Sequence, residues 1–353
     1  MNARGWSRDS SPFHAGEQQV QRRVGVRDQV ERAGRNMIRE QLLDQQRQLF
    51  EALPLLVVGS IDSQGRPWAS LLAGEPGFVR SPTPKLLQIQ AQPALGDPLR
   101  EQLTLGAPLG LLGIQLETRR RNRANGRIVA RDASSLSVQI EQSFGNCKQY
   151  VQAREPKFES SLLNAAAPPH AEGPRLSARA SELLAHTDTF FIATASASAS
   201  ASASAPAARG NHGGAESEAE GADVSHRGGR PGFVRVQTGP LATRLTVPDF
   251  SGNFMFNTLG NLEVNPRAGI VCADFNTGDI LSLTGSAHAI WDGPELAAFA
   301  GAERLLSFEV SAGFLLERAL PLRFQGCSPS PDLLETGTWA EADLSSASHA
   351  ATS

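Results

Sequence analysis

The sequence has few cysteines, little net charge and no long apolar run. Its 3 cysteines lie far apart without metal-ligand spacing, and an odd number argues against a disulfide framework, so we expect the reducing cytoplasm. A formal net charge of -3 gives no reason to expect nucleic acid as a partner. No run approaches the ~20 apolar residues of a membrane helix. The first eleven residues lack the apolar core of a secretory signal, so we expect no membrane partner either.

Catalytic signatures are lacking as well. The sequence contains no Gly-x-Ser-x-Gly elbow, no His-Glu-x-x-His motif and no Walker-type phosphate loop. It therefore identifies no catalytic residue, and no metal is expected. If the protein is an enzyme, a bound cofactor must perform the chemical step while the protein positions it.

The length and composition allow about two domains with sizeable cores, since 40% of the 353 residues are hydrophobic. Residues 1–53 form an N-terminal segment rich in Gln, Arg and Glu, in which apolar residues recur at spacings of three, four and seven. This pattern predicts one or two amphipathic helices lying over a sheet. His14 is compatible with a position near a ligand, but a solvated or capping histidine is the interpretation we favour.

The rest of the chain contains an internal repeat. The run Pro-Gly-Phe-Val-Arg begins at Pro76 and again at Pro231, and Gly110–Gly126 aligns with Gly269–Gly285, with glycines matching at both ends. Two copies of one strand-turn-strand-strand-loop-strand-strand unit explain both alignments. The predicted division is a first copy at 54–154, a connector with a short helix at 155–187, a second copy at 188–325 and a tail at 326–353.

A low-complexity segment interrupts the second copy. Residues 196–221 alternate Ser and Ala and then become rich in Gly, Glu and Ala. Such a segment has too little apolar surface to offset the entropy lost on ordering, so it is predicted to be a disordered insert. In the frame of the repeat it is an enlarged hairpin loop.

One polar segment of the second copy carries a family resemblance. Residues 252–261 read Gly-Asn-Phe-Met-Phe-Asn-Thr-Leu-Gly-Asn, Asn265-Pro266 is a turn signal, and two strands follow at 268–275 and 280–287. A strand end, an Asn/Thr-rich turn and a short helix leading into paired strands resemble the flavin-binding split barrel of the pyridoxamine 5'-phosphate oxidase-like family. The resemblance implies a mainly β fold with α, built as two tandem split β-barrels (FMN-binding split barrels) behind an N-terminal helical segment.

In that family this loop holds the phosphate and ribityl chain of FMN, so the resemblance implies a cofactor site in the second copy. The residues that would supply its hydroxyl, amide and guanidinium groups are Ser225, His226, Arg227, Asn253, Asn257, Thr258 and Asn261. Arg227 would pair with the phosphate or the ring edge, while Thr258 and Asn261 would donate to phosphate oxygens near the start of a short helix. Alternatively, the Asn and Thr residues are ordinary caps and Arg227 lies in a solvated turn.

Two departures from the family pattern concern the positive charge at the phosphate. Gly260 stands where many members carry Lys or Arg, and the first copy has Leu71-Leu72 in place of the His-Arg pair, so its site is expected to be degenerate. Arginines crowd residues 119–127 and either reach across to the other copy's ligand or form a charged hairpin facing solvent. RNA binding is a third alternative, against which the acidic balance and the lack of interleaved aromatics argue.

The resemblance implies a function as well as a fold. It points to an FMN-binding oxidoreductase that uses a reduced nicotinamide or similar donor and has a nicotinamide cofactor or a small anionic substrate as partner. Two alternatives stay open, a non-catalytic flavin-binding or structural module and an electron-transfer partner of a separate reductase. Another flavin or a deazaflavin also stays open as the cofactor. Since the family builds its flavin site where two barrels meet, we expect an intramolecular pseudo-dimer or a homodimer.

Overall fold

The computed structural model describes residues 5–163, 165, 167–197, 199 and 221–351. The protein is mainly β with helices, and its strands form two large antiparallel sheets and a third sheet of two strands. Neither large sheet closes into a barrel through hydrogen bonds within these residues. In the described part of the chain, no helix is both long and apolar enough to cross a membrane.

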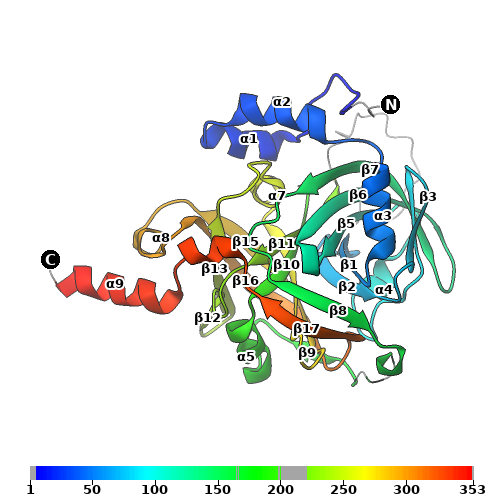
Figure 1. The fold of residues 1–353 in the computed structure, drawn as a ribbon. Coiled ribbons are helices and arrows are strands. Elements are labelled where there is room, and N and C mark those ends of the chain that lie inside the picture. The colour runs from blue at the N-terminus through cyan, green and yellow to red at the C-terminus, as the bar shows by residue number, and fades with distance from the viewer. Residues whose placement is uncertain (1–4, 164, 166, 198, 200–220, 352–353) are drawn as a thin grey trace.

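Three helices precede the first sheet, where the apolar spacing predicts one or two. They are α1 (Ala15–Arg23), α2 (Arg27–Met37) and α3 (Asp44–Ala52). His14 caps α1, because its Nδ1 accepts a hydrogen bond from the backbone N–H of Gly16 at 3.1 Å. Its side chain is buried rather than solvated. Figure 1 shows α1 and α2 above α7 (Asn257–Val264), which α1 contacts.

The first large sheet has seven strands in the order β2-β1-β5-β6-β7-β4-β3. They are β1 (Leu55–Ile61), β2 (Pro67–Ala73), β3 (Val79–Thr83), β4 (Leu86–Ile89), β5 (Pro108–Gln115), β6 (Arg120–Arg131) and β7 (Leu136–Asn146). Between them lie α4 (Leu99–Gln102) and a 3-10 turn, η1 (Leu116–Thr118). Strand β7 is long, because its backbone stays paired with β6 as far as Asn146.

The second large sheet has the order β11-β10-β14-β15-β16-β13-β12, with β9 beside β16. Its strands are β9 (His170–Glu172), β10 (Thr189–Ala195), β11 (Ala222–Gly228), β12 (Arg235–Thr238), β13 (Thr243–Phe250), β14 (Arg267–Ala273), β15 (Ile280–Ile290) and β16 (Ala302–Leu316). Helix α5 (Ala178–His186) precedes β10, and α8 (Pro294–Ala298) precedes β16. Counted from the first strand of each copy, both sheets have the same order, 2-1-5-6-7-4-3.

Matching glycines occupy matching places in the two sheets. Gly126 and Gly285 each follow a shift of strand register, where an added Cβ would lie about 2 Å from a carbonyl oxygen of the neighbouring strand. Gly77 and Gly232, from the repeated pentapeptide, have φ of 95° and 84° in the turns before β3 and β12. The repeat read from the sequence is therefore a repeat of backbone structure.

The two large sheets pack against each other through reciprocal contacts. A Cβ added to Gly110 of β5 would lie 2.6 Å from the Cα of Asp223 in the second sheet, and one added to Gly269 of β14 would lie 2.7 Å from the Cα of Trp68 in the first. An apolar core with side chains from both sheets, among them Leu71, fills part of the interface. The glycines allow a closer approach of the strands than any side chain would permit.

The segments around the second copy also have regular structure. The expected connector contains β8 (Ala153–Phe158), η2 (Ser160–Leu162), β9 and α5. The expected tail contains the end of β17 (Leu322–Ser328), η3 (Pro331–Glu335) and α9 (Trp339–Ala351). Strands β8 and β17 pair as the two-stranded sheet, and α9 projects away from the sheets in Figure 1. Residues 198 and 200–220 of the low-complexity segment lie outside the described residues.

Candidate functional site

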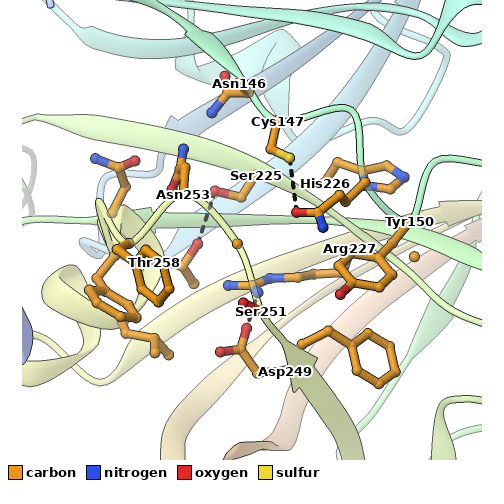
Figure 2. Close-up of a pocket in the computed structure, with 18 of the residues that line it drawn as sticks. Asn146, Cys147, Tyr150, Ser225, His226, Arg227, Asp249, Ser251, Asn253 and Thr258 are labelled. Carbon is orange, nitrogen blue, oxygen red and sulfur yellow. Dashed lines mark hydrogen bonds and ion pairs between the residues drawn. The ribbon is translucent and has the colours of Figure 1, made fainter. Parts of the chain in front are cut away.

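A pocket lies where the two large sheets meet, beside β11 and the start of α7 (Figure 2). Its empty volume, including the mouth that opens to solvent, is about 860 Å³, which gives room for a ligand much larger than an ion. Both sheets contribute to its wall. Its lining contains four arginines, Arg121, Arg123, Arg227 and Arg304, and one carboxylate, Asp249, and we call it the arginine pocket.

Two of these arginines reach the pocket from the first sheet. Arg121 and Arg123 are two residues apart on β6, so they point to the same side of the strand. The Nη2 of Arg123 donates to Ser225 Oγ at 2.7 Å and its Nη1 donates to Asn257 Oδ1 at 2.6 Å. Its Nε lies 3.1 Å from the Asp223 carboxylate. This one guanidinium therefore ties β6 to three polar groups of the second sheet and its loop.

The prediction of a charged hairpin facing solvent is wrong for Arg121 and Arg123. Residues 120–131 form a long strand instead of a hairpin, and the alternation of its side chains sends these two into the interface. Other arginines of the cluster behave differently. Arg120 is exposed, and Arg119 donates to the carbonyl oxygens of Val151 and Ser328, which holds it outside the pocket.

Arg121 has no carboxylate partner within the described residues. Its Nε donates to the carbonyl oxygen of Cys147 at 2.7 Å, and its Nη1 lies 3.2 Å from Nδ1 of His226. Burial lowers the pKa of Arg121 to about 10, with Arg123 and Arg227 adding to the effect. The side chain is still protonated at neutral pH, so the pocket holds a cation that no carboxylate of the described residues pairs.

His226 is a neutral hydrogen-bonding group. Burial first, and then the nearby Arg121 and Arg227, hold its pKa well below the usual 6.5. Because a guanidinium only donates, Nδ1 of His226 accepts from Arg121 and the proton of the neutral ring lies on Nε2. That Nε2 is buried and has no hydrogen-bond partner within the described residues. The imidazole therefore offers one unused donor.

Arg227 shares a carboxylate with a second arginine. Its Nη1 contacts Oδ1 of Asp249, and Nε of Arg304 donates to Oδ2 of the same residue at 2.8 Å. Figure 2 shows the Arg227 side chain extended toward Asp249 across the pocket. Arg304 also donates to Glu303 at 2.6 Å, and the buried Nε of Arg227 has no partner in the described structure. Arg227 belongs to β11, opposite Phe190, and not to a solvated turn.

The loop that leads into α7 has an unusual backbone. Phe254 and Phe256 have φ of 56° and 61°, and Tyr150 across the pocket has φ of 60°. Residues other than glycine rarely adopt such values, and each costs of order 1–3 kcal/mol unless the surroundings hold it. Gln21 of α1 supports the loop by donating to the carbonyl oxygen of Met255 at 3.2 Å. No side chain caps α7, so its first N–H groups lie at the pocket without a side-chain acceptor.

The structure brings most of the predicted site residues together. Those that line the arginine pocket are Ser225, His226, Arg227, Asn253, Asn257 and Thr258. Some of their polar atoms bond to the protein: Thr258 Oγ1 donates to Ser225 Oγ at 2.9 Å, and Asn253 Oδ1 accepts from the N–H of Met255 at 3.2 Å. Asn261 lies elsewhere, since its Nδ2 donates to Thr194 Oγ1 at 3.0 Å on β10 and it lines a second, smaller cavity.

Helix packing explains why residue 260 is a glycine. Helix α1 crosses α7 at this point, and a Cβ added to Gly260 would lie 2.5 Å from the backbone N of Glu17. A Lys or Arg here would push α1 off α7. The positive charge in the pocket comes instead from β6 of the other sheet, through Arg121 and Arg123.

Helix α1 also places a buried carboxyl behind the pocket wall. Asn257 Nδ2 donates to Glu17, while Oδ1 of the same amide accepts from Arg123. Burial raises the pKa of Glu17, although His14 and these hydrogen bonds partly oppose the change. His14 itself lines the smaller cavity and not the arginine pocket. The amide of Asn257 thus bridges α1 to the first sheet's arginine.

Some lining residues carried no local signal in the sequence. Asp249 ends β13 and Arg304 begins β16, and the two are cross-strand neighbours although 55 residues separate them. Asn146 ends β7, residues 147, 149 and 150 follow that strand, and all four line the pocket.

Comparisons with known proteins add little. No protein-family model matches the chain, and no curated protein matches it. Solved structures that resemble it include HupZ from Group A Streptococcus, at 12% identity over 38% of this chain and 90% of that one, with a TM-score of 0.27. A single-residue variant of HupZ matches at 14% identity over 39% and 98%, also at 0.27. At that TM-score the likeness decides nothing about the fold or the function of this chain.

Proposed function

We propose that the two halves of the chain are tandem split barrels, that FMN binds in the arginine pocket between them, and that the protein is an FMN-dependent oxidoreductase. The observation that carries the proposal is the set of four guanidinium groups, one of which, Arg121, has no carboxylate partner among the described residues, in a pocket that also contains the N-terminus of α7. A dianionic phosphate is the ligand group that such a set of donors recognises best.

The residues of the pocket fit the parts of FMN. Arg121, Arg123 and the first N–H groups of α7 would hold the phosphate. Amides and hydroxyls in the wall, such as Asn253 and Ser225, suit a polar ribityl chain. The aromatic side chains of the lining, Tyr150, Phe250, Phe254 and Phe256, would cover a flat ring. The FMN-specific part of this assignment rests on the family resemblance of residues 252–287.

The protein's own contribution to a redox reaction would be electrostatic. A bound flavin would supply the electron transfer, and the protein would position it and set its surroundings. His226 is neutral and has an unused Nε2–H, so it would donate a hydrogen bond to an acceptor atom of the ligand and not a proton. The positive pocket would also attract an anionic substrate or the phosphate of a nicotinamide donor.

The first test concerns the phosphate. FMN should bind more tightly than riboflavin by at least one charge-assisted contact, about 1.5–3 kcal/mol, or roughly 10- to 150-fold at 25 °C. Quenching of flavin fluorescence measures both affinities on the same protein. Equal affinities for the two flavins would show that the phosphate makes no favourable contact in the arginine pocket, which would contradict the assignment of FMN.

The second test separates the oxidoreductase from the two alternatives. Steady turnover of NADPH by the flavin-loaded protein alone supports the oxidoreductase. A bound flavin that is reduced only after a separate reductase is added supports an electron-transfer partner. A bound flavin that neither system reduces supports a non-catalytic flavin-binding module, and a purified protein that takes up no flavin supports a structural module.

A further inference from the structure

A second pocket lies among segments that flank the second copy of the repeat. It is bounded by α5, by the turn at 273–276, by Arg154 of β8 and by Phe324 of β17. Its empty volume, including an open mouth, is about 1040 Å³, and it shares no lining residue with the arginine pocket. We call it the Arg154 pocket.

The floor of the Arg154 pocket is an ion pair with one unused atom on each partner. Arg154 and Asp188 are each 9% exposed, and Nη2 of the arginine contacts Oδ2 of the aspartate. Nη1 of Arg154 and Oδ1 of Asp188 are buried without a hydrogen-bond partner in the described structure. A buried pair with unmet groups is costly, and hydrogen bonds that complete it recover that cost.

One aromatic ring lies against this pair, and a second lies against the first. The guanidinium carbon of Arg154 lies 4.4 Å from the centre of the Phe275 ring. The Phe324 ring meets Phe275 edge-on, with centres 4.6 Å apart at 66°. A donor and an acceptor on one ion pair, beside two aromatic rings, match the edge and the faces of a flat heterocycle.

The charges of the lining distinguish this pocket from the arginine pocket. Two arginines are offset here by three carboxylates, Glu182, Asp188 and Asp274, and Arg179 is itself bound to Asp279 at 2.7 Å. The pocket therefore has no cation left over for a phosphate. It favours a neutral or weakly basic ring.

We infer that the Arg154 pocket binds a planar heteroaromatic group that carries a hydrogen-bond acceptor beside an N–H donor. The acceptor takes the Nη1–H of Arg154, and the N–H donates to Oδ1 of Asp188. Adenine presents such an edge, and so does the carboxamide of nicotinamide. This site does not depend on whether the arginine pocket binds FMN.

The experiment titrates the full-length protein with adenosine and with nicotinamide by calorimetry. At least one of the two compounds should bind with 1:1 stoichiometry. The compound that binds shows whether the pocket recognises the adenine ring or the nicotinamide carboxamide. Asp188→Asn, which keeps the shape but removes the charged acceptor, should weaken that binding at least 10-fold. Because the substitution alters a buried pair, its thermal unfolding and circular dichroism must be compared with those of the parent.

A chemical test avoids the buried pair altogether. Cys327 is exposed and lines the Arg154 pocket. Alkylating it with N-ethylmaleimide in a Cys147→Ser background should therefore weaken the affinity for the compound at least 10-fold. The matched control is Cys147→Ser with Cys327→Ser, which should keep its binding after the same treatment. Failure of both compounds to bind at millimolar concentration overturns the proposal. Binding that resists both Cys327 alkylation and Asp188→Asn overturns it as well.

Discussion

The arginine pocket and its counterpart on the other side of the sheet interface have opposite character. Strand register makes Ile280 and Ser282 of β15 the counterparts of Arg121 and Arg123, because Ser282 pairs with Val271 as Arg123 pairs with Leu112. Ile280 and Ser282 are buried, and so are Leu71 and Leu72, which replace the His-Arg pair. Figure 2 shows the polar side chains of the arginine pocket, whereas apolar core fills its counterpart at the interface.

The difference shows that equivalent positions of the two copies can serve different purposes, apolar packing in one and charged groups for a ligand in the other. Fully burying a Leu or Ile contributes about 1.5–3 kcal/mol, whereas burying arginines near one another does not stabilise the fold. Ile280 and Leu71 belong to the core shared by both sheets. The filled side therefore holds the halves together, which allows the other side to keep charged groups for a ligand.

The largest expected effect comes from putting a charge at Leu72, which replaces Arg227 in the first copy and lies in the apolar core of the first sheet. Leu72 is 1% exposed in the core of the first sheet, so Leu72→Arg should lower the free energy of unfolding by about 3–5 kcal/mol, the cost of an uncompensated buried charge. Urea denaturation measures this. The mirrored change, Arg227→Leu, should cost less because Asp249 keeps Arg304. Equal costs would contradict the difference between the two sides.

A second effect comes from Asp97, which bonds to Ser70 on the filled side as Thr258 bonds to Ser225 in the pocket. Burial raises the pKa of Asp97 to about 6 from an ordinary 3.8. An acid whose pKa is raised by folding stabilises the protein least above that pKa, so stability should fall as pH rises from about 4 to 6. Asp97→Asn should then stabilise the protein at pH 7 by about 3 kcal/mol at most.

The measurement for Asp97→Asn is the difference in unfolding free energy from the parent at pH 7 and at pH 4. The gain should shrink at the lower pH. Asp132→Asn is the matched control, since backbone and side-chain hydrogen bonds from Ser134 and Ser135 lower the pKa of Asp132 to about 2 on the surface. Its pH trend should have the opposite sign. A gain for Asp97→Asn that is independent of pH would contradict a buried, titrating carboxyl.

A smaller effect, on binding alone, is expected for Arg121→Gln. The side chain has no carboxylate partner within the described residues, so its loss leaves no buried anion unpaired. FMN affinity should fall by about 1.5–3 kcal/mol while the melting temperature changes little. The control is Arg120→Gln, one residue away on β6 and exposed. The same loss of affinity for both variants would show a general charge effect and not a contact in the pocket.

Sequence reading went furthest where the signal was local. The amphipathic spacing before residue 53, the strand pairs and the repeated glycines all depend on near neighbours, and helices, strands and repeat appear where these predict them. The polar loop at 252–261 was also visible, because its small polar residues break the apolar pattern. Pairing with β6 extends β7 through Gly145 to Asn146, and that pairing depends on a neighbouring strand and not on the local sequence.

What the sequence determined by itself is the repeating order of strands and the polar chemistry of one loop in the second copy. Arg121 and Arg123 share a face because the structure makes residues 120–131 a strand, where the sequence analysis considered a hairpin. Only the tertiary structure decided which face meets the second sheet, because that depends on the close approach of strands at Gly110 and Gly269. The pairing of Asp249 with Arg304 and the rotation of Asn261 toward Thr194 were decided in the same way, by contacts between residues far apart in the chain.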